Sequence, residues 1–369
     1  MNDHAPGTSS PAPAPAVPPS TSFDVTLFGA IGDGQADDTA AIQHTIDLAA
    51  EAGGGAVWFP PGAYACSTLR VPSYVGLFGH PTWSYHQPGG TYLQLNDENA
   101  DCLIDLTGSH GARVVGLALE GGKLGEDVIG IYINGENHKQ EDTLFIENCR
   151  IARFTGDGVR LDHVWGYTVR NNMIIFNGGD GLSLTRWDGW IYQNIFNNNA
   201  GYGIHARRPN GAMSIVANRI EWNHTGGLYV HSGGGHHHIN GNYFDRSGGP
   251  AIHLAGTADR PVDTISITGN IIHRSGARVD LESDQCCHLL LEHCQGVVCT
   301  GNAFHAGAND SGQGQNSPTT GLVLDSLEAS IIRNNVMYCA VVRELMLDRG
   351  GHDEQTIIAD NIGCPAKSP

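Results

Sequence analysis

The feature that most constrains the fold is an asparagine that returns at nearly even intervals from residue 148 onward. The positions are Asn148, Asn172, Asn194, Asn218, Asn242, Asn270, Asn302, Asn335 and Asn361, separated by 24, 22, 24, 24, 28, 32, 33 and 26 residues. A repeat of about 20 to 50 residues is typical of a solenoid, in which each coil buries its apolar side by stacking on the next. We expect the asparagine at a turn of each coil, because Asn tolerates the left-handed conformation and can hydrogen-bond to its equivalent one coil away.

The segments between these asparagines contain short β-rich runs without helical periodicity. Examples are GYTVRNNMIIF, GWIYQNIF, MSIVANRI, TISITGNII and SIIRNNVMY. Coils of about 22 to 24 residues with several strands and no helix indicate a parallel β-helix, because leucine-rich coils of similar length carry a different Leu and Asn pattern. The wider spacings after Asn242 predict loops inserted at coil corners, notably at residues 305–318. Such insertions commonly wall a binding face.

The first part of the chain follows a different pattern. DDTAAIQHTIDLAAEAGGG predicts one amphipathic helix of about 14 residues, which begins in an acidic N-cap region and ends at Gly53. The residues of the N-cap region are Asp37, Asp38 and Thr39, and those of the apolar face are Ile42, Ile46 and Ala49 or Ala50. The helix is followed by a strand, GAVWFPPGAY. We expect the helix to cap the open end of the solenoid, which otherwise exposes apolar surface.

These patterns divide the chain into two parts. Residues 1–22 are Pro/Ala/Ser-rich and are predicted to form a disordered arm. Residues 23–369 are predicted to form a single all-β domain of about ten coils. Within it, residues 23–64 form the cap and first strands, residues 65–363 the coils and residues 364–369 a tail.

Charge and composition limit the partners. Twenty basic and 38 acidic side chains give a net charge of −18, which disfavours nucleic acid and anionic membrane, so an anionic substrate needs a local basic patch. There is no apolar run long enough for a spanning helix, and no signal peptide is visible in the printed sequence. The nine cysteines include no CxxC pair and are expected to be core thiols, with at most one local disulfide, in the cluster Cys286, Cys287, Cys294 and Cys299.

The segment Phe23 to Tyr64 carries a family resemblance. FDVTLFGAIGDGQADDTAAIQHTIDLAAEAGGGAVWFPPGAY resembles the N-terminal signature of the pectate-lyase-like superfamily of single-stranded right-handed parallel β-helix proteins, and the asparagine coils extend the likeness to about residue 363. This superfamily includes lyases, polygalacturonase-type hydrolases, epimerases, fructotransferases and tailspike depolymerases. The resemblance implies a right-handed β-helix and a bias toward carbohydrate, but no particular reaction.

One strand of each coil can be aligned after a glycine corner, from GIYING at residue 130 to RVDLES at residue 278. Strand alternation predicts an apolar core column of Ile131, Val159, Leu182, Ile204, Leu228, Ile252 and Val279. The exposed third positions are Tyr132, Arg160, Ser183, His205, Tyr229, His253 and Asp280. The exposed fifth positions are Asn134, Asp162, Thr185, Arg207, His231, Ala255 and Glu282. With strands about 4.8 Å apart, these side chains form a continuous strip of roughly 30 Å.

The strip is rich in His, Tyr, Arg and carboxylates, a composition that suits sugar chemistry. Cleavage of a uronide by β-elimination needs a neutraliser for the carboxylate, a base for the adjacent proton and an acid for the leaving oxygen. Arg207 or Arg160 is expected to neutralise the carboxylate. His205 or His231 is expected to act as the base, and Tyr229 as the acid.

Two other uses of the strip stay open. Hydrolysis or fructotransferase-like glycosyl transfer needs two carboxyl groups about 5 to 9 Å apart, and the available pairs are Asp280 with Glu282, or Asp162 across the strip. A non-catalytic glycan-binding or tailspike-like module needs only exposed aromatic and polar groups. Substrate contacts are expected from Tyr132, Arg160, Arg186, Trp187, Asp188, Trp190 and His253.

The run GGGHHHING contains His236, His237 and His238, which raises the question of a metal. Consecutive strand residues point to opposite faces, so at most two of the three imidazoles converge. We therefore expect no metal site and no cofactor.

Together these observations predict a carbohydrate-active enzyme that cleaves or rearranges a glycan, with lyase-type elimination favoured over hydrolysis or transfer. The expected partner is an oligo- or polysaccharide, and a homo-trimer is one expected assembly, since such solenoids often associate side by side. We expect an extracellular or secreted protein whose signal peptide is not in the printed sequence. A cytoplasmic enzyme acting on a small metabolite is the alternative.

Overall fold

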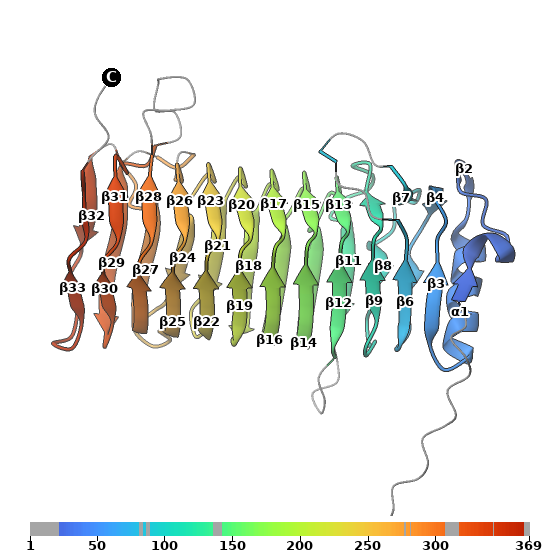
Figure 1. Cartoon of the computed structure of the whole chain (residues 1–369), viewed down its shortest axis with the longest axis horizontal. Coiled ribbons are helices and arrows are strands. Elements are labelled where there is room, and N and C mark those ends of the chain that lie inside the picture. Colours follow the sequence, from blue (N-terminus) through green and yellow to red (C-terminus); the bar gives the residue numbers. More distant parts are fainter. Residues whose placement is uncertain are drawn as a thin grey trace, which may run out of the picture.

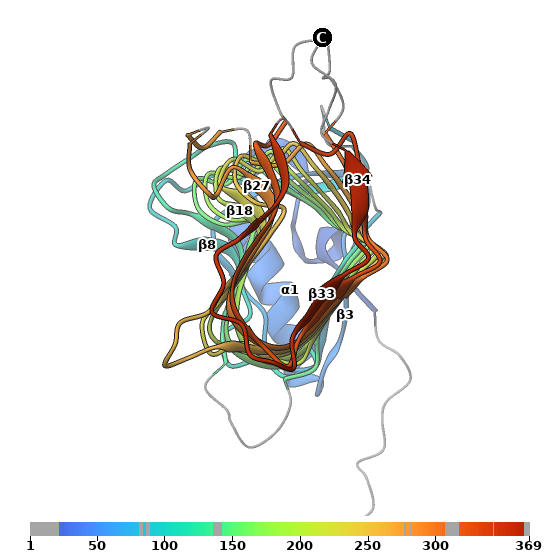
Figure 2. The ribbon, with the colours of Figure 1, turned by 90° about the vertical axis from the view of Figure 1, so that its left-hand side faces the viewer.

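The computed structural model describes residues 22–80, 84–85, 89–135, 142–276, 278–280, 282–306, 317–341 and 343–364. Figure 1 shows a single long stack of coils, with the N-terminal helix at one end and β32 and β33 at the other. Viewed along the stack, the coils superimpose into one closed outline (Figure 2). The predicted arm at residues 1–22 lies outside the described residues except for Ser22, which begins the first strand.

All strand pairs between successive coils are parallel, and the strands form two sheets. The longer sheet contains β1 (Ser22–Asp24), β3 (Gly55–Trp58), β5 (Leu69–Arg70), β6 (Val75–Phe78), β8 (Cys102–Asp105), β9 (Arg113–Val115), β11 (Ile129–Asn134), β12 (Leu144–Glu147), β14 (Val159–Arg170), β16 (Leu182–Tyr192), β18 (Tyr202–Asn210), β19 (Met213–Val216), β21 (Gly226–His231), β22 (Gly235–Asn240), β24 (Ile252–Ala255), β25 (Val262–Thr268), β27 (Cys287–Thr300), β29 (Thr320–Glu328), β30 (Ile331–Arg333), β32 (Glu344–Asp348) and β33 (Ile357–Ala359).

The shorter sheet contains β2 (Asp33–Asp37), β4 (Gly62–Cys66), β7 (Thr91–Leu95), β10 (Ala118–Glu120), β13 (Arg150–Ala152), β15 (Met173–Ile175), β17 (Ile195–Asn197), β20 (Arg219–Glu221), β23 (Tyr243–Asp245), β26 (Ile271–His273), β28 (Ala303–His305), β31 (Val336–Tyr338) and β34 (Ile362–Cys364). Its 13 strands are more layers than the nine asparagines had marked, because the first coils carry no asparagine at that corner.

The predicted core column is confirmed over six coils. Ile131, Val159, Leu182, Ile204, Leu228 and Ile252 pair in register and are fully buried. The coil beyond Ile252 is not the predicted one: Ile252 pairs with Leu289 of β27, not with Val279. The described residues of the segment 274–286 instead form an inserted loop between β26 and β27. Their alternating RVDLES pattern is indistinguishable in sequence from a strand.

The recurring asparagines form a buried ladder, as predicted. From Asn172 to Asn361 each side-chain amide donates to the Oδ1 of the next asparagine at 2.9–3.1 Å. Each amide also donates to a backbone carbonyl of the preceding coil, for example from Asn194 to Val169 at 2.8 Å. A second ladder, which the spacing did not reveal, joins Asn177, Asn199 and Asn223 at the following corner.

Two details of the asparagine prediction are wrong. Asn148 is one residue out of phase, since the backbone N–H of Cys149 donates to the Oδ1 of Asn172 and so Cys149 holds the ladder position. The ladder asparagines also do not adopt the left-handed conformation. That role belongs to the residue before each of them, such as Asn171, Gln193 and Ala217, with φ of 53°, 59° and 56°.

Replacing Asn218 by Ala is expected to lower the free energy of unfolding by about 3 to 5 kcal/mol, because it leaves several buried groups without partners. These are the backbone N–H and side-chain amide of Asn194, and the carbonyl of Ile191. Urea unfolding measures the change. Asn240→Ala, which removes a part-buried amide bonded to the hydroxyl of Thr268, is the matched control and should cost less than about 1 kcal/mol. Equal losses of unfolding free energy in both variants would contradict a stabilising role for the asparagine ladder.

The predicted helix is present as α1 (Thr39–Glu51) and follows a short 3₁₀ turn, η1 (Val25–Phe28). Its buried residues are Ile42, Thr45, Ile46 and Ala49, and the three apolar ones belong to the core cluster. In the view along the stack α1 crosses the interior of the coil outline (Figure 2). Asp38 does not cap the helix with its side chain. Its carboxylate instead accepts from the backbone N–H groups of Ile31 and Gly32, at 2.6 and 3.0 Å.

The nine cysteines are all unpaired, and seven are buried, as expected of core thiols. Burial raises the pKa of Cys149 and Cys299 to about 12, so neither is a thiolate near neutral pH. No helix in the described ranges has the length and apolar character that crossing a membrane requires. The predicted loop at residues 305–318 lies mostly outside the described residues.

Candidate functional site

The predicted strip exists on the outer face of β11, β14, β16, β18, β21 and β24. The third-position residues Tyr132, Arg160, Ser183, His205, Tyr229 and His253 pair in register from one strand to the next. The fifth positions are less regular, because the register shifts after Leu161 and again after Leu184. The third-position side chains of His205, Tyr229 and His253 are neighbours. The ring centroid of Tyr229 lies 5.5 Å from that of His205 and 4.8 Å from that of His253.

His205 is held by a carboxylate from the preceding coil. Its Nδ1 lies 2.6 Å from Oδ2 of Asp180, while Oδ1 of Asp180 accepts the backbone N–H of Tyr202 at 2.7 Å. Since a carboxylate can only accept, Nδ1 of His205 carries a proton, and in the neutral imidazole Nε2 then presents a lone pair. Nε2 is buried and has no hydrogen-bond partner. Ser183, the strip residue on the coil of Asp180, is small and buried. A small side chain there leaves room for the contact between Asp180 and His205.

Aromatic side chains surround this imidazole. His231 stacks on His205 with centroids 5.2 Å apart, and Tyr202 lies 5.0 Å from His205. Burial is the main cause that lowers the pKa of His231, so His231 is neutral at neutral pH. Burial raises the pKa of Tyr229, and it raises that of Tyr202 to about 12. Both phenols therefore keep their protons, as a general acid requires.

The basic side chains of the strip are partly engaged with carboxylates. The Nη2 atom of Arg207 is ion-paired with Oδ1 of Asp162, while the Nε atom of Arg207 is buried without a partner. Arg160 donates through Nε to Asp157 at 2.7 Å. Arg208 is exposed, and its charge opposes the rise in the pKa of Tyr229 and adds to the fall in the pKa of His231. Arg207 also lowers the pKa of His231, so both arginines lie close enough to act on this imidazole.

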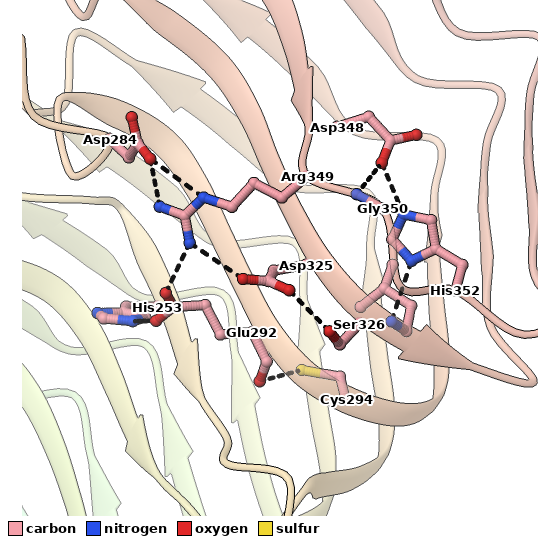
Figure 3. A network of polar contacts seen from close by, with 11 residues as sticks. His253, Asp284, Glu292, Cys294, Asp325, Ser326, Asp348, Arg349, Gly350 and His352 are labelled. Atoms are coloured by element: carbon pink, nitrogen blue, oxygen red, sulfur yellow. Dashed lines mark hydrogen bonds and ion pairs between the residues drawn. The ribbon is translucent and has the colours of Figure 1, made fainter.

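A second histidine–carboxylate pair lies on the other side of Tyr229. Nε2 of His253 is 2.8 Å from Oε2 of Glu292, and the hydrogen bond from His253 lowers the pKa of Glu292. The other oxygen of Glu292 accepts from Arg349 at 3.0 Å (Figure 3). Arg349 also contacts Asp284 of the inserted loop and Asp325 of β29. The network thus ties the last coil and the loop to the strip.

Asp280 and Glu282 do not belong to the strip, and the prediction that they form a catalytic pair on it is wrong. In their predicted places stand Leu290 and Glu292, which pair with His253 and Ala255. Asp280 and Glu282 lie exposed on the inserted loop, where Glu282 forms an ion pair with Arg343. The strip therefore continues to Glu292, not to Asp280.

The two tryptophans of β16 follow the register shift after Leu184 and lie in different surroundings. Trp187 packs 5.6 Å from Trp165, with the guanidinium of Arg186 5.2 Å from its ring. Asp188 accepts from the indole N–H of Trp165 at 2.7 Å. Trp190 is 50% exposed but pairs with Thr168 and Ser214, beyond the register shift and away from the histidines. Of the two tryptophans predicted to contact substrate, Trp187 thus lies nearer the strip.

The three consecutive histidines diverge, as alternation predicted. His237 is buried and bonded through Nε2 to Asn210 at 2.8 Å, whereas His236 and His238 are exposed on the other face. Among the described residues no group of three His, Cys, Asp or Glu side chains could hold a metal ion.

Sequence reasoning missed Asp180, Tyr202, Arg208, Glu292 and Arg349. Asp157, Asp180 and Tyr202 occupy equivalent corner positions on successive coils. The backbone N–H of Asp180 donates to Oδ1 of Asp157, and the backbone N–H of Tyr202 donates to Oδ1 of Asp180. The signal is the recurrence of D-G, D-G and Y-G before three successive strands. Glu292 and Arg349 carried no such signal, since the inserted loop hid the register of their coils.

Residues 129–304 match the family model described as "Right handed beta helix region". The chain has the fold of a right-handed parallel β-helix. Among curated proteins, an alignment 233 residues long, which covers 57% of this chain, gives 28% identity to mannuronan C5-epimerase AlgE3 of Azotobacter vinelandii. Another alignment, 205 residues long and covering 50% of this chain, gives 29% identity to alginate lyase 7 of the same bacterium. These matches span only 12% and 23% of those two proteins.

Solved structures show the same fold. The A-module of the Azotobacter vinelandii mannuronan C-5 epimerase AlgE6 superposes with a TM-score of 0.67 at 18% identity, covering 94% of this chain and all of that module. The tailspike protein of the E. coli bacteriophage HK620, solved with a pentasaccharide, superposes with a TM-score of 0.68 at 13% identity, covering 93% of this chain and 67% of the tailspike. At these identities the likeness concerns the fold alone.

Proposed function

We propose that the chain is a carbohydrate-active enzyme that cleaves a uronic-acid glycan by β-elimination. The observation that carries this proposal is the Asp180–His205 pair, whose unpartnered Nε2 lies among Tyr229, His231 and the two arginines of β18. An imidazole oriented by a carboxylate is the arrangement of a general base, and the His205 side chain keeps 19% of its surface exposed for contact with a substrate. The names of the curated relatives, which are mannuronan epimerases and an alginate lyase, support a uronan as the substrate.

In this mechanism Arg207 and Arg208 bind the sugar carboxylate and make the neighbouring C–H more acidic. Nε2 of His205 removes that proton, and the imidazolium is stabilised by Asp180. The electrons of the C–H bond form a C=C bond as the bond from C4 to the glycosidic oxygen breaks. The leaving oxygen receives the phenolic proton of Tyr229, which then regains a proton from water.

The placement of the groups favours elimination over its rivals. Epimerisation also begins with proton removal, but it returns a proton to the opposite face of the sugar. In the described part of the chain, His205, Tyr229 and His253 all project from one side of one sheet. Elimination needs only one such face. Hydrolysis would need two uncommitted carboxyl groups, whereas Asp162 is paired with Arg207 and Asp180 with His205.

Incubation of the chain with polymannuronate and polygalacturonate should release oligosaccharides with unsaturated ends, detected by their ultraviolet absorbance. Proton NMR in deuterium oxide distinguishes the alternatives. Inverted C5 centres with an intact chain would indicate epimerisation, and new reducing ends without unsaturation would indicate hydrolysis. Binding without any of these products would favour a non-catalytic glycan-binding module. Each of these three results would overturn the elimination proposal.

A further inference from the structure

A hollow of about 670 Å³ lies at the coil corners that lead from the shorter sheet into the strip. Its lining comes from equivalent corner positions on successive coils, including Thr155, Gly178, Ala200 and His224. The backbone N–H groups of the last three donate to carbonyls of the coil before, at 2.8–2.9 Å, which fixes them as one column. The middle members, Gly178 and Ala200, have almost no side chain, so the column is recessed between its larger ends.

The charged groups of the hollow, Lys123 and Arg153, are both basic. Its lining includes Lys123, Arg153 and His224 but no Asp or Glu, although the whole chain carries a net charge of −18. Arg153 is ion-paired with Glu120 at 3.2 Å, whereas no ion pair joins Lys123 to another described residue. Burial and the nearby Arg278 lower the pKa of His224, which is therefore a neutral hydrogen-bonding group at neutral pH.

The rest of the lining suits a sugar ring. Phe154, Phe176 and Tyr85 supply apolar and aromatic surface, and Asn198 supplies an amide that can donate and accept. The volume falls within the range of about 300 to 1,000 Å³ that is usual for small-ligand sites. Apolar walls with a few polar and cationic groups are the composition expected for an anionic sugar.

The hollow lies on the same coils as Asp180 and His205, just before them along the chain. Gly178 stands two positions before Asp180, and Ala200 stands two positions before Tyr202, the residue whose N–H binds Asp180. A sugar unit in the hollow therefore lies near the corner that carries Asp180, on the side where the strands begin.

We infer that this hollow is a subsite for a carboxylate-bearing sugar unit, which anchors the chain next to the unit that reacts. The inference rests on the proposed function and adds its substrate class: an anionic glycan with a charged unit on both the reactive and the anchoring positions. Lys123 is the residue expected to favour a charged sugar over a neutral one, because its ammonium has no carboxylate partner among the described residues and is available to the ligand.

Binding is tested on the full chain carrying His205→Ala, so that no turnover occurs. Isothermal titration calorimetry compares trimannuronate with neutral mannotriose, each with and without Lys123→Asn. Asn is chosen because Lys123 has φ of 60°, which Asn tolerates. Arg333→Gln, which removes a cation paired with Asp360 elsewhere, is the matched control for net charge.

We expect Lys123→Asn to raise the Kd for trimannuronate at least tenfold, Arg333→Gln to change it less than twofold, and Lys123→Arg to restore it. Mannotriose should bind at least tenfold more weakly than trimannuronate. An unchanged Kd in Lys123→Asn, or equal affinity for the neutral sugar, overturns the subsite. Because turnover is measured separately on the chain with His205 intact, cleavage with an unchanged Kd would reject the subsite and retain the proposed function.

Discussion

Replacing His205 by Ala is expected to lower kcat for glycan cleavage by about 10² to 10⁴-fold, with little change in KM. The substitution removes the Nε2 lone pair that accepts the sugar proton, while the arginines that bind the carboxylate stay in place. Initial rates of formation of unsaturated ends measure the effect. His236→Ala removes an exposed imidazole from β22, away from the strip, and should leave kcat within twofold.

Asp180→Asn tests the orientation of the base by a different route. Asp180 accepts two hydrogen bonds, from the N–H of Tyr202 and from Nδ1 of His205. An Asn that keeps the first with its oxygen turns its NH₂ toward His205, which then carries its proton on Nε2 and loses its function as base. We expect a loss of kcat close to that of His205→Ala, with the folded state retained. Full activity in both variants, with loss in His231→Ala, would transfer the role of base to His231.

Sequence reasoning placed a residue correctly where strand alternation and the regular coil spacing together determine its position. The column from Ile131 to Ile252 is apolar at each member, so one register buries it and any shift by one residue would expose it. His205, Tyr229 and His253 were placed by the same register. The prediction succeeded for them because no insertion interrupts the coils between β18 and β24 on that face.

The errors arise where the chain leaves the repeat. The loop before β27 contains RVDLES, which alternates as well as the true strand segment CHLLLEH, and no local property distinguishes them. Core packing determines which segment forms the next strand, since Leu289 and Leu291 are fully buried while Val279 is only half-buried. Asp180 was missed for another reason: it lies at a corner, where alternation gives no direction for a side chain.

Acidification from pH 7 to pH 5 is expected to lower the free energy of unfolding by about 4 kcal/mol through two buried histidines. His237 accepts the N–H of Met213 with Nδ1 and is bonded through Nε2 to Asn210, and burial lowers its pKa to about 3. His288 donates through Nε2 to the carbonyl of Ala340 at 2.8 Å, and burial lowers its pKa to about 4.

The sign follows from which state binds the protons. In the unfolded chain both imidazoles titrate near 6.5, whereas in the folded protein both stay neutral down to about pH 4. Between these pH values the unfolded state binds protons that the folded state does not bind. The free energy of unfolding therefore falls as the pH falls, by about 2 kcal/mol for each histidine at pH 5. His288→Phe, beside Phe304 in the core, removes one of the two groups. Urea unfolding at the two pH values should show a loss about 2 kcal/mol smaller in this variant than in the wild type, because one of the two fully buried imidazoles is gone. A loss equal to that of the wild type would mean that His288 is already protonated in the folded protein.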